Sequence, residues 1–99
     1  MRLEFEDDDL RRLYQESDFR APGWGPELLR SYRKVLGFVE AASDERDLRA
    51  MKSRHLEKLK GSRRGQYSLQ LHQQWRLVFR IGAFHDEQQV VVIEVVDYH

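Results

Sequence analysis

The stretch that decides the fold is YSLQLHQQWRLVFRIGAFHDEQQVVVIEVV, residues 67–96. Within it, apolar and polar side chains alternate over residues 67–72 and again over residues 75–81. Residues 90–96 are almost continuously β-branched, which also favours a strand. The connections at residues 73–74 and 82–88 are short enough for hairpins. The sequence therefore predicts three consecutive strands in an antiparallel sheet.

A long amphipathic helix is predicted before this sheet, over residues 27–42. Its apolar residues recur at spacings of three and four, as expected for one buried helix face; they are Leu28, Leu29, Tyr32, Val35, Leu36 and Val39. Pro26 stands where a helix favours its first residue. This segment carries the clearest helical pattern in the chain.

Shorter elements are predicted on either side of the long helix. Residues 1–5 are typical of a short strand or edge segment, and the acidic residues 7–9 favour the start of a helix through Tyr14. Ser43, followed by two acidic residues, is typical of the cap of a further helix through Met51. Together these patterns predict a compact α+β fold, with N-terminal helices packed on one face of a small antiparallel sheet.

Length and composition indicate one small domain over residues 1–99, because no linker or low-complexity run divides the chain. There is no cysteine, and the histidines at positions 55, 72, 85 and 99 lack metal-ligand spacing. The acidic N-terminus holds no apolar stretch typical of a signal peptide or membrane span. We therefore expect a cytoplasmic protein without metal, cofactor or membrane partner.

Charge is distributed unevenly, although the formal net charge is zero. Residues 1–18 carry seven acids and three bases, whereas residues 46–64 carry eight Lys/Arg and two acids. A chain polarised in this way can present a basic face to a polyanion. The alternative is that the bases of residues 46–54 only solvate a helix.

Three features could bind or cleave a nucleic acid. The first is the turn KLKGSRRG at residues 58–65, whose cations could contact phosphates: Lys58, Lys60, Arg63 and Arg64. The second is the pair Arg76 and Arg80, which alternate onto one face of a strand. The third is the polar triplet at residues 97–99, which directly follows an apolar strand. Taken singly, the basic turn could be a solvated loop, the arginine pair could lie on an ordinary solvent face, and the triplet could be a frayed chain end.

The same residues resemble the HigB branch of the RelE-like toxins, in the RelE/ParE superfamily of toxin-antitoxin systems. The resemblance rests on L-K-G-x-R-x-G-x-Y-S at residues 59–68, Q-W-R-L-x-F at residues 74–79 and D-Y-H at residues 97–99. Order, spacing and ending agree over residues 56–99, whereas the first half is similar only in length and pattern.

The resemblance implies a toxin that cleaves messenger RNA in the ribosomal A site, without a metal. It also implies a cognate HigA-like antitoxin with a helix-turn-helix, through which alone the toxin would reach an operator DNA.

By position in the motifs, Lys60 and Arg76 would hold the scissile phosphate. His99 would transfer protons, Tyr98 would stack on or orient a base, and Asp97 would orient its neighbours or assist proton transfer. Supporting contacts to RNA would come from Lys58, Arg63, Arg64 and Arg80.

One position departs from the HigB pattern, because several family members have histidine where this chain has Glu57. Glu57 could serve as a base or as a structural residue. Two other functions stay open: a non-catalytic RNA- or ribosome-binding module of the same fold, and an interaction protein that uses the Trp24 region and the long helix. The aromatic residues Trp75, Phe79 and Phe84 are interpreted as packing rather than base-stacking residues.

Overall fold

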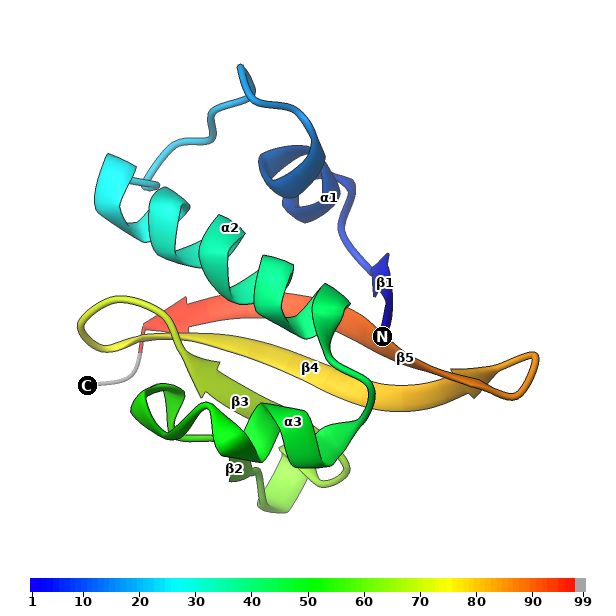
Figure 1. Cartoon of the computed structure of the whole chain (residues 1–99). Helices are drawn as coiled ribbons and strands as arrows, with labels where there is room; N and C mark the ends of the chain where they lie inside the picture. Colours follow the sequence, from blue (N-terminus) through cyan, green and yellow to red (C-terminus); the bar gives the residue numbers. More distant parts are fainter. Residues whose placement is uncertain (98–99) are drawn as a thin grey trace.

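A computed structural model describes residues 1–97 of the chain, and these form a mixed α+β structure (Figure 1). The helices are α1 (Asp8–Gln15), α2 (Pro26–Ala41) and α3 (Glu45–Ala50), with short 3-10 turns η1 (Lys52–Arg54) and η2 (Gly61–Arg63). The strands are β1 (Arg2–Phe5), β2 (Glu57–Lys58), β3 (Tyr67–Gln70), β4 (Trp75–Phe84) and β5 (Glu87–Asp97). The α+β class predicted from the sequence is confirmed.

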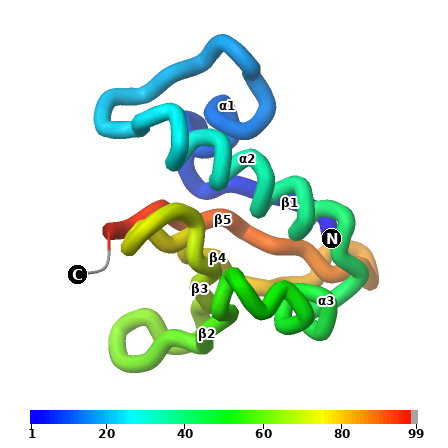
Figure 2. Tube along the Cα trace, turned by 60° about the vertical axis from the view of Figure 1, so that its left-hand side comes forward, coloured from blue at the N-terminus to red at the C-terminus, as the bar shows by residue number. Residues whose placement is uncertain are grey.

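One sheet joins these strands in the order β1-β5-β4-β3-β2. Strands β3 to β5 are antiparallel neighbours, as predicted. The short strand β2 was not predicted and pairs antiparallel with β3, whereas β1 pairs with β5 in parallel, so the sheet is mixed. The antiparallel prediction rested on short hairpin connections, which do not constrain two strands from opposite ends of the chain. Figure 2 shows the result: the start of β1 and the end of β5 lie on opposite sides of the molecule.

The hairpin between β4 and β5 is tighter than the predicted connection of residues 82–88. Phe84 pairs with Glu87, so the turn contains only His85 and Asp86. Both have left-handed backbone angles, with φ of 50° and 66°, as a type I′ turn requires. This hairpin projects past the core, and residues 83–88 at its end are exposed (Figure 1). The apolar alternation therefore stops before the strands do.

The helices begin close to their predicted positions. Helix α2 starts at Pro26 and buries the six predicted apolar residues. Asp7 caps α1, and its carboxylate accepts a hydrogen bond from the Asp9 backbone N–H at 2.7 Å. Helix α3 is capped by Asp44 instead of Ser43, whose N–H donates to the Asp47 carboxylate at 2.8 Å. The cap therefore moves by one residue, and the helix ends before Met51.

All three helices pack against the same face of the sheet. Side chains of α1, α2 and α3 form one apolar cluster with alternate residues of β3, β4 and β5, including Leu77 and Phe79. Tyr32 of α2 is fully buried, and its hydroxyl donates to the Leu10 carbonyl oxygen at 2.7 Å. Burying such side chains contributes about 1.5–3 kcal/mol each. The opposite face of the sheet, which we name the open face, is left for polar side chains.

Candidate functional site

The centre of the open face is a row of side chains in register across four strands. Glu57 of β2 pairs with Ser68 of β3, Ser68 with Val78 of β4, and Val78 with Glu94 of β5. Val78 and Ser68 are fully buried. Because directly paired residues point to the same side of a sheet, two carboxylates flank a small buried floor of valine and serine on this face.

Arg76 lies two residues before Val78 in β4, on the same face of the sheet, and its side chain is only 13% exposed. Its Nε donates to the Ser68 hydroxyl at 2.8 Å, and its Nη2 donates to the His55 carbonyl oxygen at 2.5 Å. His55 has a left-handed φ of 49°, at the end of η1. These bonds hold the guanidinium in one orientation while leaving other N–H groups for a ligand.

Glu57 is the carboxylate that forms an ion pair with this guanidinium. Its Oε1 lies 3.9 Å from Arg76 Nη2, and its side chain is 61% exposed. The structure therefore brings the predicted base candidate together with the predicted phosphate ligand. An exposed carboxylate at this distance can exchange protons with solvent or balance the charge of Arg76.

The basic turn folds back over the open face through Arg63. Arg63 Nη1 donates to Gln66 Oε1 at 3.0 Å, and Nη2 forms an ion pair with the Glu94 carboxylate. Gly61 and Gly65 have φ of 64° and 90°, so the turn uses left-handed angles that glycine adopts without strain. Arg63 thus joins the row that already contains Glu57 and Ser68.

The other cations of the turn are placed differently. Lys60 and Arg64 are exposed, and within residues 1–97 no hydrogen bond or ion pair involves their side chains. Lys58 pairs with Tyr67, so it lies on the helix-covered side, away from Arg76. There it contributes, after Tyr67 and Arg49, to lowering the pKa of Glu45.

Arg80 shares the open face with Arg76 but lies four residues along β4, roughly 13 Å away at the usual rise of a strand. Its Nη1 is 2.6 Å from the Glu6 carboxylate, and both side chains are about half exposed. The structure thus separates Arg80 from the cluster around Arg76.

The chain end reaches the site through β5. Val96 pairs with Arg76 on the open face, whereas Asp97, the last described residue, pairs with Trp75 and therefore lies on the opposite side of the sheet from Arg76. The predicted roles of Tyr98 and His99 lie outside the described residues. The structure therefore brings Arg76 and the basic turn together on the open face, and it places Asp97 beside Trp75 instead.

Several contributors were missed by sequence reasoning. Ser68, Glu94 and the His55 carbonyl contact the predicted arginines, yet none was selected from the sequence. A signal was present for Glu94, the only acid in the β-branched run of residues 90–96. Ser68 gave a weaker signal, as a small polar residue inside an alternating strand.

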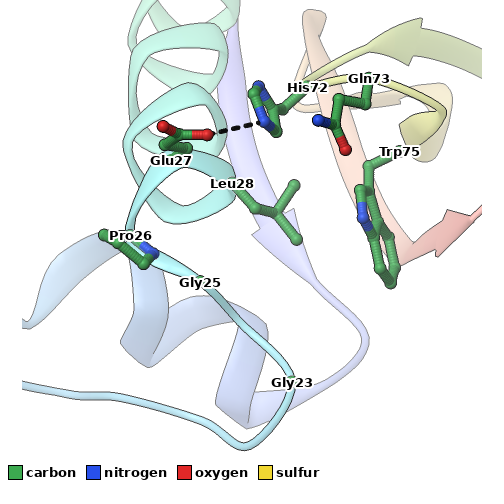
Figure 3. A pocket seen from close by; sticks show the side chains of 8 residues that line it. All are labelled: Gly23, Gly25, Pro26, Glu27, Leu28, His72, Gln73 and Trp75. Carbon is green, nitrogen blue, oxygen red and sulfur yellow. Dashed lines mark ion pairs between the residues drawn. The ribbon is translucent and has the colours of Figure 1, made fainter.

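A pocket of about 260 Å³ lies at the end of the sheet where β4 begins and β5 ends (Figure 3). It is bounded by the segment that leads into α2, the first turn of α2, the β3–β4 turn and Trp75. His72 Nε2 and Glu27 Oε2 are 3.0 Å apart and join the β3–β4 turn to α2. Sequence reasoning treated Trp75 as a packing residue, whereas the structure places it in the pocket wall as well as against the core.

Two structural findings concern metals and membranes. Within residues 1–97, no group of three or more His, Asp or Glu side chains could hold a metal ion. None of the helices in that range is long and apolar enough to cross a lipid bilayer.

Comparisons with known proteins agree with this architecture. Residues 3–99 match the profile of a family described as RelE-like toxin of type II toxin-antitoxin system HigB. Among solved structures, the chain is similar to a YoeB/ParE toxin from Agrobacterium tumefaciens, with a TM-score of 0.58 and 18% identity over 100% of both chains. At that identity the likeness concerns the fold. No curated protein matches the chain.

Proposed function

We propose that this chain, which belongs to the HigB family of RelE-like toxins of type II toxin-antitoxin systems, cleaves messenger RNA in the ribosomal A site without a metal ion. In this proposal residues 1–99 act as one toxin domain in the cytoplasm. A helix-turn-helix antitoxin of the HigA type holds the domain inactive and alone connects it to operator DNA.

The proposed chemistry is attack by the ribose 2′-hydroxyl on the adjacent phosphate. The 2′-hydroxyl loses a proton, the pentavalent phosphate gains charge, and the 5′-oxygen leaves with a proton, giving a 2′,3′-cyclic phosphate. Arg76 and Lys60 would stabilise the added charge, with Arg63 in support. His99 would carry the protons, with Glu57 as the alternative base. Tyr98 would stack on or orient a base, and Asp97 would orient its neighbours or assist proton transfer.

The observation that carries this proposal is the fixed guanidinium of Arg76. A donor that is already oriented by Ser68 and His55 needs little reorganisation when negative charge develops beside it. Since few groups surround it, ribosomal positioning of the RNA would supply part of the rate. Free RNA should therefore be a poor substrate.

The test uses purified protein with translating ribosomes, and maps the new 5′ ends of the messenger. Wild type should produce new ends, and Arg76→Ala should lower the cleavage rate by roughly 10²- to 10³-fold, as expected when an oriented donor to the transition state is lost. His99→Ala should also reduce cleavage. Arg46→Ala is the matched control, because Arg46 lies on α3 and forms its ion pair with Asp44, the N-cap of the same helix.

The same experiment distinguishes the second candidate, a non-catalytic RNA- or ribosome-binding module. Phosphate contacts through these cations need no proton transfer and give salt-sensitive binding. Ribosome binding without new 5′ ends would favour that module. Cleavage that is unchanged in both Arg76→Ala and His99→Ala would contradict the proposed site.

A further inference from the structure

The pocket of Figure 3 has no role in the chemistry proposed above. We propose that it binds one nucleobase of the RNA, and specifically a base that carries an exocyclic amino group. This inference rests on the proposed function and adds a specificity site to it. The pocket would then bias cleavage toward positions with such a base at a fixed distance from the cut.

Its location connects the pocket to the phosphate site. Trp75 and Arg76 are adjacent in β4, and their side chains point to opposite faces at the end of the sheet. Trp75 also pairs with Asp97, where β5 ends. An RNA strand held by Arg76 reaches the pocket by passing this end, so the bound phosphate and the bound base belong to different nucleotides.

The walls of the pocket suit a flat ligand. Trp75 supplies a half-buried indole, and Leu28 supplies a buried apolar floor (Figure 3). On the other side, Gly23 and Gly25 carry no side chain, and the space where a Cβ would stand is open. Stacking on an aromatic side chain is the usual way that proteins bind an unpaired base.

The polar groups select among ligands. The Glu27 carboxylate, which is 68% exposed and lies 3.0 Å from His72 Nε2, repels a phosphate but accepts hydrogen bonds from an amino group. Gln73 adds an amide that both donates and accepts. Adenine, cytosine and guanine each offer an exocyclic amino group to these acceptors, whereas uracil has none. At about 260 Å³ the pocket is smaller than most sites for drug-sized ligands, which begin at roughly 300 Å³, and it accommodates one base.

The experiment uses Trp75 as its own reporter. Trp24→Phe leaves Trp75 as the only tryptophan, and Phe keeps the ring that packs on Tyr32. The probes are 2′-O-methyl oligonucleotides of equal length, which cannot be cleaved, made of adenosine, cytidine, uridine or abasic units. Binding is followed at low salt by Trp75 fluorescence and, independently, by anisotropy of a labelled oligonucleotide.

We expect the adenosine and cytidine oligomers to quench Trp75 and to bind roughly tenfold tighter than the abasic oligomer, the size of one stacking interaction. The uridine oligomer should bind with intermediate affinity, because uracil stacks but offers no amino group to Glu27. Trp75→Leu should remove this advantage without weakening the abasic oligomer, and Trp75→Phe should keep part of it. Glu27→Gln should reduce the preference over uridine while stacking remains.

Equal binding of all four oligomers with unchanged Trp75 fluorescence would overturn the inference and leave the proposed cleavage intact. Base-selective binding to a protein that makes no new 5′ ends on ribosomes would keep the pocket and reject the proposed cleavage. Absence of binding by all four oligomers would overturn the base pocket, and ribosome mapping would then decide the cleavage separately.

Discussion

The two faces of the sheet are built from alternate residues of the same strands, yet they carry different kinds of side chain. The helix-covered face buries Leu69, Leu77 and Phe79 against the helices in one apolar cluster. The open face carries Arg76, Arg63 and two carboxylates around a buried valine and serine. Stability and proposed chemistry are therefore separated by the pleat of the strands, and substitutions one position apart should have different effects.

The largest effect on stability should come from the covered face. Phe79 is fully buried and stacks on Tyr67, with ring centroids 5.8 Å apart. Phe79→Ala should lower the free energy of unfolding by about 3–5 kcal/mol, because it leaves a cavity in the core. Urea unfolding measures this change. The neighbouring Arg80→Ala on the open face should cost less than about 1 kcal/mol, and a loss as large as that of Phe79→Ala would contradict the separation of the two faces.

Ser68 should affect both stability and cleavage, because it is buried while it orients Arg76. Ser68→Ala leaves Arg76 Nε without its hydroxyl acceptor and should cost about 1–3 kcal/mol of unfolding free energy. We also expect slower cleavage on ribosomes. Ser68→Thr retains the hydroxyl and should restore cleavage more than stability. Equal cleavage by Ser68→Ala and wild type would show that this bond does not orient the guanidinium for reaction.

A smaller effect is expected at Glu94, where a substitution should strengthen RNA binding. Its carboxylate holds Arg63 and competes with a phosphate for the same guanidinium. Glu94→Gln should therefore tighten RNA binding several-fold at low salt and steepen the salt dependence by about one phosphate contact. Its unfolding free energy should change by less than about 1 kcal/mol. Glu87→Gln, at the far end of β5, is the matched control; weaker binding by Glu94→Gln alone would mean that Glu94 positions Arg63 productively.

The last expected effect lies inside the helical layer and is confined to high pH. Burial, and then the hydrogen bond to Glu40, raise the pKa of Tyr14 from 10.0 to about 12. A raised pKa stabilises the fold below pH 10, where the phenol stays protonated in both states, and this contribution is lost as the pH rises through about 12. Stability should thus fall between pH 10 and 12 less steeply in Tyr14→Phe than in wild type. Unfolding curves at several pH values measure this, and identical slopes would refute it.

Much of the architecture could be predicted because it depends on local pattern. The spacing of Leu28 to Val39 sets one apolar helix face, and the alternation in residues 75–81 sets which β4 residues share a side. That alternation put Arg76 and Arg80 on one face, as the register confirms. It could not show that Arg80 pairs with Glu6, because Glu6 follows a strand from the other end of the chain.

What the sequence by itself determined is therefore the three helices, the strands other than β2, the order of the hairpins, the family signature and the set of cations. Only the tertiary structure decided how these meet: β1 parallel to β5, Lys58 turned away from Arg76, Arg63 on Glu94, and the start of α2 beside Trp75 to form a pocket. The physical reason is that helical and strand periods are properties of neighbouring residues. Contacts between distant segments depend instead on which register and crossover bury the most apolar surface in the folded chain.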